Sequence, residues 1–436
     1  MFLKAKQTDR IIKKQIISQI TTKYALALLR NMPKFSLRNT FLTTNVLVLG
    51  IVSLLADLST EMIQPLLPLF LVSVLGTSYT IVGLVEGSSD ATTSIVKVIS
   101  GWYSDRFSRR KPFVVAGYLP TAVLKPLLYF VQTPLQVISI RVPDRVGKGI
   151  RGAPRDALIA ESVEKENLGK AFGFHRALDS LGAVLGSFLG FVLLMIIVGS
   201  SSDIYRIIFV MSAVPAIVSV IIGQVFIKEV KPIVTIKSKK SHTSFLQGIR
   251  SFDSRLKFFL LVCSIFAFAN FNISFFILKA KDTGLSDIDV VLLYVLYNIM
   301  YTAVSYPFGA IADKIGREKV IIMGMGVFIF ATIGFTYLSP SLVNVVMLFA
   351  ILGVYIGIFD GSQKAYISEI ANPSLKATAL GTVATLTGVI TLPSSLVAGI
   401  LWDRFGSAST FEFGAIVALL ALTSFAIFLL KFKISH

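Results

Sequence analysis

The chain contains a long internal repeat with an offset of 208 positions. Two runs share a glycine, an aspartate, an arginine and a lysine at identical spacing: GWYSDRFSRRK, which begins at Gly101, and GAIADKIGREK, which begins at Gly309. The same offset relates further positions, namely Gly76 and Gly284, Gly149 and Gly357, Ala157 and Ala365, Glu161 and Glu369, and Gly173 and Gly381. A repeat of this length indicates two homologous halves of roughly 200 residues each.

The composition restricts the solvent in which these halves can fold. Hydrophobic residues make up 54% of the 436 residues and charged residues 15%, whereas soluble domains carry about 25% charged residues. A membrane-spanning helix needs about 20 apolar residues. Twelve segments satisfy this requirement: 43–74, 79–104, 112–131, 134–160, 171–198, 205–227, 257–280, 288–312, 319–338, 342–369, 377–402 and 410–430.

We therefore expect an all-α integral membrane protein, with twelve transmembrane helices in two pseudo-symmetric six-helix bundles. Two homologous apolar halves with a cleft between them are typical of secondary transporters.

The net charge of +18 is better explained by membrane topology than by nucleic-acid binding, because Lys and Arg accumulate in cytoplasmic loops. With the N-terminus inside, 29 of the 42 basic residues fall on the cytoplasmic side. The basic residues at the opposite face are Arg206, Lys279, Lys281 and Arg404. The sequence thus predicts a multi-pass protein of the plasma (inner) membrane with both termini cytoplasmic, and no nucleic-acid partner.

The same pattern predicts the domain boundaries. Residues 1–41 form a basic cytoplasmic arm, 42–228 the first six-helix bundle, 229–256 a cytoplasmic linker and 257–431 the second six-helix bundle.

The arm has a possible lipid-binding face. Ile12, Ile16 and Ile20 share one side of a helix beside Lys13 and Lys14. This pattern predicts either an amphipathic helix that lies on anionic membrane lipid or a mobile basic tail.

The two repeated runs resemble motif A of the major facilitator superfamily. The resemblance covers nearly the whole chain, from about residue 42 to 430, because it also rests on the second motif copy, the twelve spans and the long basic middle loop. The first copy has Ser108 where the family usually has glycine, whereas the second copy keeps Gly316. The resemblance implies a transporter fold and not an enzyme.

The two motif copies also predict an inner gate. Their glycines allow helices to approach closely, and their aspartates can pair with a basic residue of the loop and with the N-terminus of a helix from the other half. We expect Arg109 to pair with Glu161, and Arg317 with Glu369. These pairs would lock the gate in the outward-open state and break on opening; the alternative is solvated loop charges. The gate residues are Gly101, Asp105, Arg109, Glu161, Gly309, Asp313, Arg317 and Glu369.

The span 134–160 carries seven ionisable groups within an arc of about 140°. They are Arg141, Asp144, Arg145, Lys148, Arg151, Arg155 and Asp156. Facing lipid, they would cost on the order of 20 kcal/mol, so the arc must face water or partners. We expect a substrate cavity lined by Arg141, Lys148, Arg151 and Arg155. The run from Arg145 to Gly149 resembles the superfamily's motif B, which implies a role in proton coupling for Arg145.

Two pairs of carboxylates lie on the first two spans. Asp57 and Glu61 are four residues apart, as are Glu86 and Asp90. Carboxylates at this spacing in a poorly solvated site resist joint ionisation, so one of each pair can carry a proton. These four residues are candidates for proton coupling. The alternative is that the charges only pair and hold the first half together.

The second half has few charges within its spans, mainly Asp360 and Lys364, which can neutralise each other. Its polar and aromatic residues instead form a wall that could stack a ring or hold a cation, or could be ordinary packing. The cavity candidates on this wall are Asn270, Tyr294, Tyr297, Asn298 and Tyr301.

These patterns predict a secondary active transporter that works by alternating access, is coupled to protons and moves a small organic solute. Five cations against two acids on the span 134–160 favour an anionic or zwitterionic solute. Sodium is the alternative coupling ion, although the sequence offers no clear set of oxygen ligands for it. We expect a monomer without cofactor or metal.

Other functions leave weaker signals. A multidrug efflux antiporter would use the aromatic wall for lipophilic or cationic compounds. An enzyme or a scaffold on this fold is a further alternative, but the chain has no nucleotide loop, HExxH motif or nucleophile elbow. The single cysteine, Cys263, excludes an internal disulfide and a cysteine metal cluster.

Overall fold

The structure is a computed structural model that describes residues 42–107, 109–164, 167–230, 250–337, 339, 341–372 and 375–434. The predicted arm, including its isoleucine face, and most of the predicted linker 229–256 lie outside the described residues. The helices below all belong to one compact unit that begins at Thr43.

The described residues are helical and contain no strand, in agreement with the predicted fold class. The helix ends agree with the predicted spans to within four residues. In the first half the segments are α2 (Thr44–Ile63) with α3 (Leu66–Leu69) and the π-turn η1 (Phe70–Val74), α4 (Tyr79–Phe107), α5 (Lys111–Leu124) with the 3-10 turn η2 (Lys125–Phe130), α6 (Pro134–Glu161), α7 (Leu168–Ile196), and α8 (Ser201–Met211) with α9 (Ala213–Phe226). In the second half they are α11 (Ser254–Ala269) with α12 (Ser274–Asp282), α13 (Asp287–Ile315), α14 (Arg317–Tyr337), α15 (Leu342–Ile370), α16 (Lys376–Phe405) and α17 (Ser407–Ile434).

Ten of these twelve segments are long and apolar enough to cross a membrane. The other two are α4 and α6, whose charged residues require cover from neighbouring helices. That cover is close: a methyl group added at Gly149 of α6 would lie 2.6 Å from Cβ of Val96, and one at Gly117 of α5 would lie 2.6 Å from Cβ of Arg151. Small residues therefore let α4, α5 and α6 pack tightly around the polar side chains.

Local signals start and interrupt the helices that position the interior. Thr133 and Gln136 form a capping box at the start of α6, and Ser286 and Asp289 form another at the start of α13. The segment of α11 and α12 breaks at Asn270, whose backbone has φ −90° and ψ 70° and so leaves the helical region. This break brings the amides that follow α11 into the interior of the unit.

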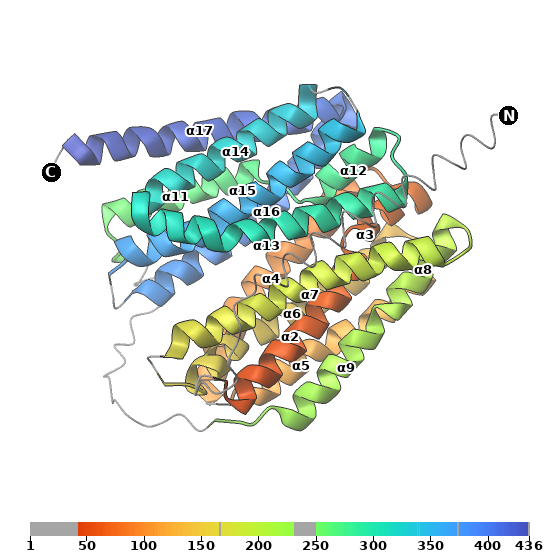
Figure 1. Cartoon of the computed structure of the whole chain (residues 1–436), viewed down its shortest axis with the longest axis horizontal. Helices are drawn as coiled ribbons and strands as arrows, with labels where there is room; N and C mark the ends of the chain where they lie inside the picture. Colours follow the sequence, from red (N-terminus) through yellow and green to blue (C-terminus); the bar gives the residue numbers. More distant parts are fainter. Residues whose placement is uncertain are drawn as a thin grey trace. The chain divides into compact units, whose positions relative to one another are not determined.

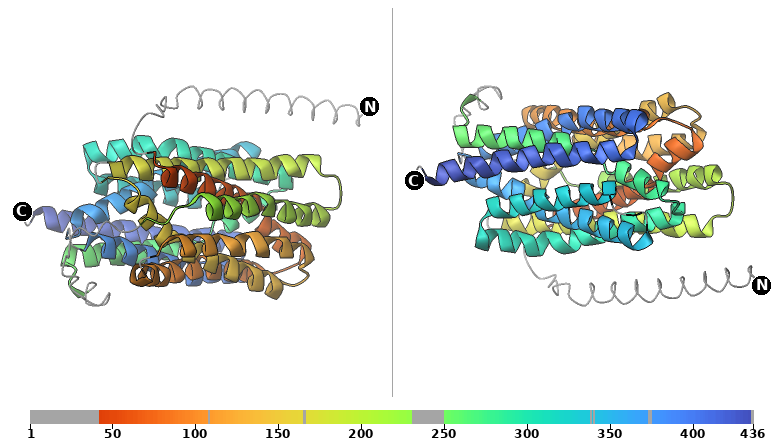
Figure 2. Two further views of the ribbon diagram at one scale, coloured as in Figure 1. Left: turned by 90° about the horizontal axis from the view of Figure 1, so that it is seen from below. Right: turned by 90° about the horizontal axis from the view of Figure 1, so that it is seen from above.

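The two halves repeat each other in space. Figure 1 shows the helices from α2 to α9 gathered in the lower part of the picture and those from α11 to α17 in the upper part, and Figure 2 gives a view onto each set in turn. The repeat-related Gly76 and Gly284 both have positive φ, 62° and 86°, at equivalent turns. Glycine adopts this conformation without steric cost, so the repeat preserves a backbone requirement as well as a motif.

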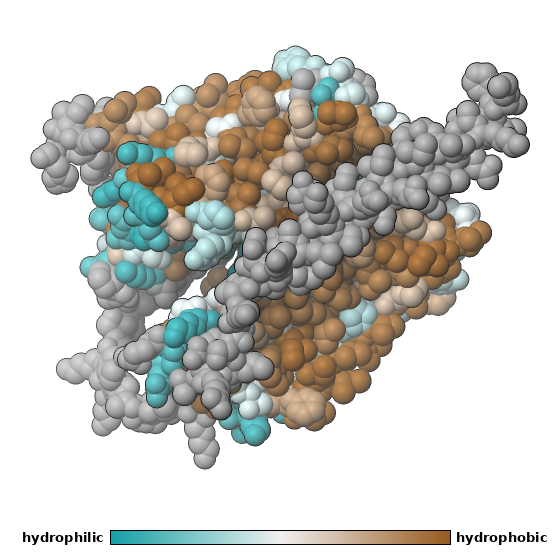
Figure 3. Space-filling model, viewed as in Figure 1, coloured by the Kyte–Doolittle hydropathy of each residue, from teal (hydrophilic) through white to brown (hydrophobic). Residues whose placement is uncertain are grey.

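The halves meet mainly along α4 and α16. A methyl group at Gly83 would lie 2.1 Å from the carbonyl oxygen of Ser395, and one at Gly388 would lie 1.8 Å from Oγ of Ser94. Farther along, α16 has no close neighbour at Gly381. We call the end where α4 and α13 begin the closed end, and the end where they finish the motif end. Figure 3 shows a hollow between the halves on its left-hand side, bordered by hydrophilic residues.

Candidate functional site

A cavity of about 360 Å³ lies between the first half and α13. We call it the charged cavity. Its walls come from α2, α4, α6, α7 and α13, and its lining includes Asp57, Glu61, Lys97, Lys148, Arg151, Arg155, Arg176, Asp179, Tyr294, Tyr297, Asn298 and Tyr301. The predicted cationic face of α6 and the predicted tyrosine face of α13 thus lie on opposite walls of one cavity.

A second cavity, of about 410 Å³, lies between α4 and the second half. We call it the aromatic cavity. It is lined by Asp90 and Thr93 of α4, by Phe266 and Asn270, and by α15 residues that include Tyr355, Phe359 and Asp360. Predicted site residues are therefore divided between two cavities.

The charges on α6 separate along the helix. Lys148, Arg151 and Arg155 line the charged cavity. Arg141 does not line it, which corrects the prediction for this residue. Its side chain is 1% exposed, and its Nη2 lies 3.4 Å from Oε2 of Glu86. Helical periodicity predicts the side of α6 on which Arg141 lies. It does not predict that α2 and α4 pack over this side chain and bury it.

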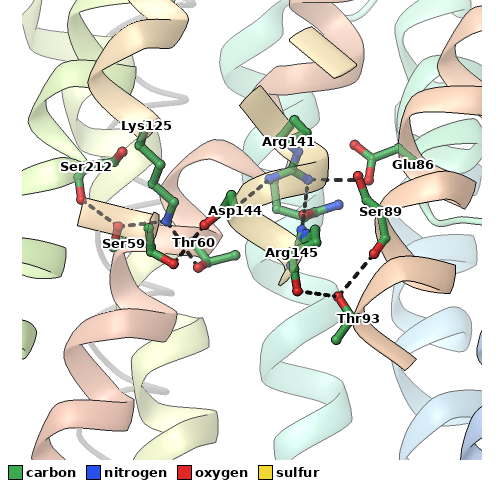
Figure 4. A network of polar contacts seen from close by, with 12 residues as sticks. Ser59, Thr60, Glu86, Ser89, Thr93, Lys125, Arg141, Asp144, Arg145 and Ser212 are labelled. Carbon is green, nitrogen blue, oxygen red and sulfur yellow. Dashed lines mark hydrogen bonds and ion pairs between the residues drawn. The ribbon is translucent and has the colours of Figure 1, made fainter. Parts of the chain in front are cut away.

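Arg141 belongs to a buried polar network near the closed end (Figure 4). Oε1 of Gln64 accepts hydrogen bonds from Nη2 of Arg141 at 3.4 Å and from Nη2 of Arg145 at 3.2 Å. Arg145 is therefore also enclosed, at 6% exposed. Because Glu86 is fully buried in this network, Glu86 and Asp90 occupy different environments despite their spacing.

Sequence reasoning missed a second branch of this network. Lys125 is 1% exposed, and its Nζ donates to Oγ of Ser59 at 2.8 Å and to Oγ1 of Thr60 at 3.1 Å (Figure 4). Thr121 donates to Oδ1 of Asp144 at 2.7 Å. The signal was present, because a lysine inside the apolar span 112–131 needs polar partners.

Two of the predicted carboxylates contact the opposite half. Oε2 of Glu61 accepts a hydrogen bond from the hydroxyl of Tyr294 at 2.7 Å, and Oδ2 of Asp90 accepts one from Nδ2 of Asn272 at 3.1 Å. Asp57 instead lines the charged cavity together with Asp179, a carboxylate of its own half.

Arg176 of α7 spans the two halves, which the sequence did not predict. Its guanidinium lies 3.6 Å from Oδ2 of Asp179 in its own half and 3.6 Å from Oδ2 of Asp360 on α15. It also donates a hydrogen bond to the hydroxyl of Tyr301. Asp360 pairs with Lys364 at 2.7 Å, as predicted. An ion-pair chain therefore runs across the cleft beside the charged cavity.

The predicted amide and tyrosine residues of the second half line the two cavities. Tyr294 and Tyr297 stack with ring centroids 5.6 Å apart. Nδ2 of Asn298 lies 3.4 Å from Oγ of Ser187, which again links the two halves. Asn270 lines the aromatic cavity.

One predicted gate pair is present and the other is shifted by one residue. Nη1 of Arg317 lies 2.9 Å from Oε2 of Glu369. In the first half, Glu161 pairs at 3.0 Å with Arg110, while Arg109 is exposed. In the second loop Gly316 has φ 101°, a conformation that glycine adopts without steric cost; the equivalent Ser108 lies outside the described residues. The side chain of Asp105 lies outside the described residues.

The expected action of these pairs also needs correction. Each pair joins helices of one half only. The pairs therefore do not have to break for this end to open. Gly309 has no close neighbour, so it does not mediate helix packing here. In contrast, a methyl group added at Gly101 would lie 3.1 Å from Cβ of Ala153.

At the closed end, the last turn of α16 contacts the start of α4. The carboxylate of Asp403 accepts hydrogen bonds from the backbone N–H groups of Tyr79 at 2.9 Å and Thr80 at 2.8 Å. Trp402 stacks on the ring of Tyr79 at 4.4 Å. Asp403 thus caps the N-terminus of α4 from the opposite half. In the described residues no group of three or more His, Cys, Asp or Glu is placed to hold a metal.

Two homologous bundles that join at one end around buried polar cavities define a polytopic membrane transporter. The family model of the Major Facilitator Superfamily matches residues 49–390. An uncharacterised transporter of the same type from Methanocaldococcus jannaschii is 38% identical over 398 residues, which are 90% of this chain and 96% of that protein. The chain therefore belongs to the Major Facilitator Superfamily, a family of transporters and not of enzymes.

Solved structures agree on the fold. The nucleoside transporter NupG superposes with a TM-score of 0.74 at 14% sequence identity, covering 88% of this chain and 99% of that one. A D-xylose–proton symporter superposes with a TM-score of 0.73 at 16% identity, covering 88% of this chain and 97% of that one.

Proposed function

We propose that the chain is a proton-coupled secondary transporter that moves small organic anions or zwitterions across the plasma membrane by alternating access. The observation that carries the proposal is the charged cavity between the halves, which lies on the path from the closed end to the motif end. We assign the motif end, both termini and the linker 229–256 to the cytoplasmic side, because basic residues gather there. The functional unit in this proposal is the monomer.

The charged cavity favours an acidic substrate group. Lys148 lines it and makes no ion pair with any described residue. Arg151 also lines it, while its guanidinium lies 4.2 Å from the ring centroid of Tyr118 and donates to the carbonyl oxygen of Gly117 at 3.2 Å. A carboxylate or phosphate of a substrate would complete the coordination of these cations.

The contact between Glu61 and Tyr294 supports a coupling mechanism. A hydrogen bond to an ionised carboxylate is stronger than one to a neutral acid. When ionised, Glu61 therefore holds α2 against α13 and favours the conformation seen here, in which the closed end is sealed. Protonation weakens this contact and favours separation of the halves at that end. Asp57 and Asp179 line the same cavity, and two carboxylates in one poorly solvated site can share a proton.

Proton flux in liposomes tests the proposal. Purified protein is reconstituted with a pH-sensitive dye inside, and a panel of organic acids, amino acids and organic cations is added outside. We expect an acid or a zwitterion to drive dye acidification, and Asp57→Asn to abolish it. Glu412→Gln is the matched control, because Glu412 contacts Tyr337 on an exposed surface. Solute movement that needs a sodium gradient instead would overturn the proton assignment.

A multidrug antiporter is the second candidate, favoured by the aromatic cavity. Phe266, Tyr355 and Phe359 form one wall of it. This candidate predicts that unrelated lipophilic cations drive proton release from the liposomes and that organic acids do not.

A further inference from the structure

The two cavities adjoin at Thr93, which lines both. Its hydroxyl lies 3.4 Å from the carbonyl oxygen of Arg145, so the side chain of Thr93 lies at the contact between α4 and α6 (Figure 4). A ligand in one cavity can therefore extend past this side chain into the other. The chemistry of the two compartments differs, and that difference restricts the ligand.

In the aromatic cavity, Asp90 is a carboxylate without a cationic partner. Its printed contact is with the neutral amide of Asn272, and it forms no ion pair with any described residue. The other carboxylate in this lining, Asp360, is already paired with Lys364 and Arg176. The carboxyl group of Asp90 therefore lines the cavity without an ion pair.

The wall near Asp90 suits a cation. The ring centroids of Phe266 and Phe359 are 4.6 Å apart, and those of Tyr355 and Phe359 are 5.9 Å apart. Ring faces attract ammonium groups, most strongly where water is excluded. Asn270 adds an amide to the same lining.

In the charged cavity the cations outnumber the carboxylates. Lys148 and Arg151 make no ion pair with a described residue, whereas Arg155 and Arg176 are engaged with Asp156, Asp179 and Asp360. Asp57 and Glu61 also line this cavity without an ion pair, and Glu61 accepts a hydrogen bond from the hydroxyl of Tyr294. The combined site thus offers unpaired cations on one side of Thr93 and the carboxylate of Asp90 on the other.

From this arrangement we infer that the substrate is a zwitterion with a compact ring or other apolar body. Its acidic group lies against Lys148, and its ammonium group lies against Asp90 and the aromatic wall. This inference rests on the proposed transport function and narrows its substrate class, because an anion without an amine would leave Asp90 buried beside it and unpaired.

Thermal unfolding of the full chain in detergent tests the inference. Unfolding is followed by differential scanning calorimetry, because Cys263, the only cysteine, lines the aromatic cavity and a bound probe would itself shield it from a thiol dye. The probes are two matched sets. One is phenylalanine with 3-phenylpropanoate and 2-phenylethylamine; the other is 4-(aminomethyl)benzoate with 4-methylbenzoate and benzylamine. The sets differ in the distance between the charges.

We expect the zwitterion of at least one set to bind about tenfold more tightly than both of its singly charged relatives, which is the effect of one additional ion pair of 1.4 kcal/mol. Asp90→Asn should remove this advantage and leave the affinity for the acid unchanged, because asparagine can still bond to Asn272. Glu412→Gln removes one carboxylate outside both cavities and should change nothing.

Equal binding of the acid and the zwitterion would overturn this inference but leave proton-coupled anion transport intact. Tightest binding of the amine would overturn both. If no probe stabilises the protein, the inference falls, and the liposome experiment decides the proposed function independently.

Discussion

The repeat-related helices α6 and α15 have diverged in chemistry while keeping their place in the fold. Gly149 and Gly357 are equivalent by the repeat, and each lets its helix approach a neighbour closely. Yet α6 carries seven ionisable groups that form a buried network and a cavity wall. On α15 the faces toward the interior are aromatic, with Tyr355 and Phe359. The two helices therefore share their backbone packing. Their side chains differ, because the first half carries charged residues where the second half carries aromatic rings.

The difference should appear first in stability. Arg141→Met leaves Glu86 buried without its cation, so we expect a loss of about 3–5 kcal/mol. A volume-conserving change at a buried position of the second half, Ile358→Leu, should cost less than about 1.5 kcal/mol. Differential scanning calorimetry measures both. Similar losses of unfolding free energy in the two variants would show that the charged network stabilises the first half no more than ordinary packing does.

Transport should show the next largest contrast. Lys148→Gln removes an unpaired cation of the charged cavity and should weaken substrate binding about 30-fold or more, the lower bound for losing one partner of a buried charge pair. Lys364→Gln should change it no more than about fivefold, because exposed ion pairs contribute at most about 1 kcal/mol and the side chain of Lys364 is 58% exposed. Titration of substrate-driven proton flux compares the two, and a larger effect at Lys364 would contradict the division of roles.

The contact between the halves gives a smaller effect. Glu61→Gln weakens a hydrogen bond to a charged group, which contributes about 1.5–3 kcal/mol. We expect gradient-driven flux to lose its dependence on pH while exchange of substrate across the liposome membrane continues. Tyr294→Phe removes the same hydrogen bond but keeps the carboxylate, so it should alter the rate and retain the pH dependence. Loss of exchange in Glu61→Gln would assign Glu61 to substrate binding instead.

The motif loops should show the smallest effect. Arg110→Gln breaks a partly exposed pair with Glu161, and Arg317→Gln breaks the equivalent pair with Glu369, so each should cost about 0.2–1 kcal/mol. Arg109→Gln should have no effect, because this side chain is exposed. Melting temperatures of the three variants test the one-residue shift between the loops, and a loss confined to Arg109→Gln would restore the pairing expected from the motif.

Much of the fold could be predicted because its signals are local. Apolar stretches defined the helices to within four residues, and the repeat defined the two halves. Part of the site was also predictable: helical spacing placed Lys148 and Arg151 on one face, and both line the charged cavity. The pair between Arg317 and Glu369 followed from the motif alone.

The tertiary structure decided which of these side chains share an environment. Periodicity gives the angle of a residue around its helix, but the depth at which neighbours close over it depends on packing. For this reason Arg141 is enclosed while Lys148 lines the charged cavity. Likewise, Glu86 is buried while Asp90 lines the aromatic cavity. The contacts of Arg176 with Asp360 and of Glu61 with Tyr294 join residues far apart in sequence. Only the docking of one half against the other brings such groups together.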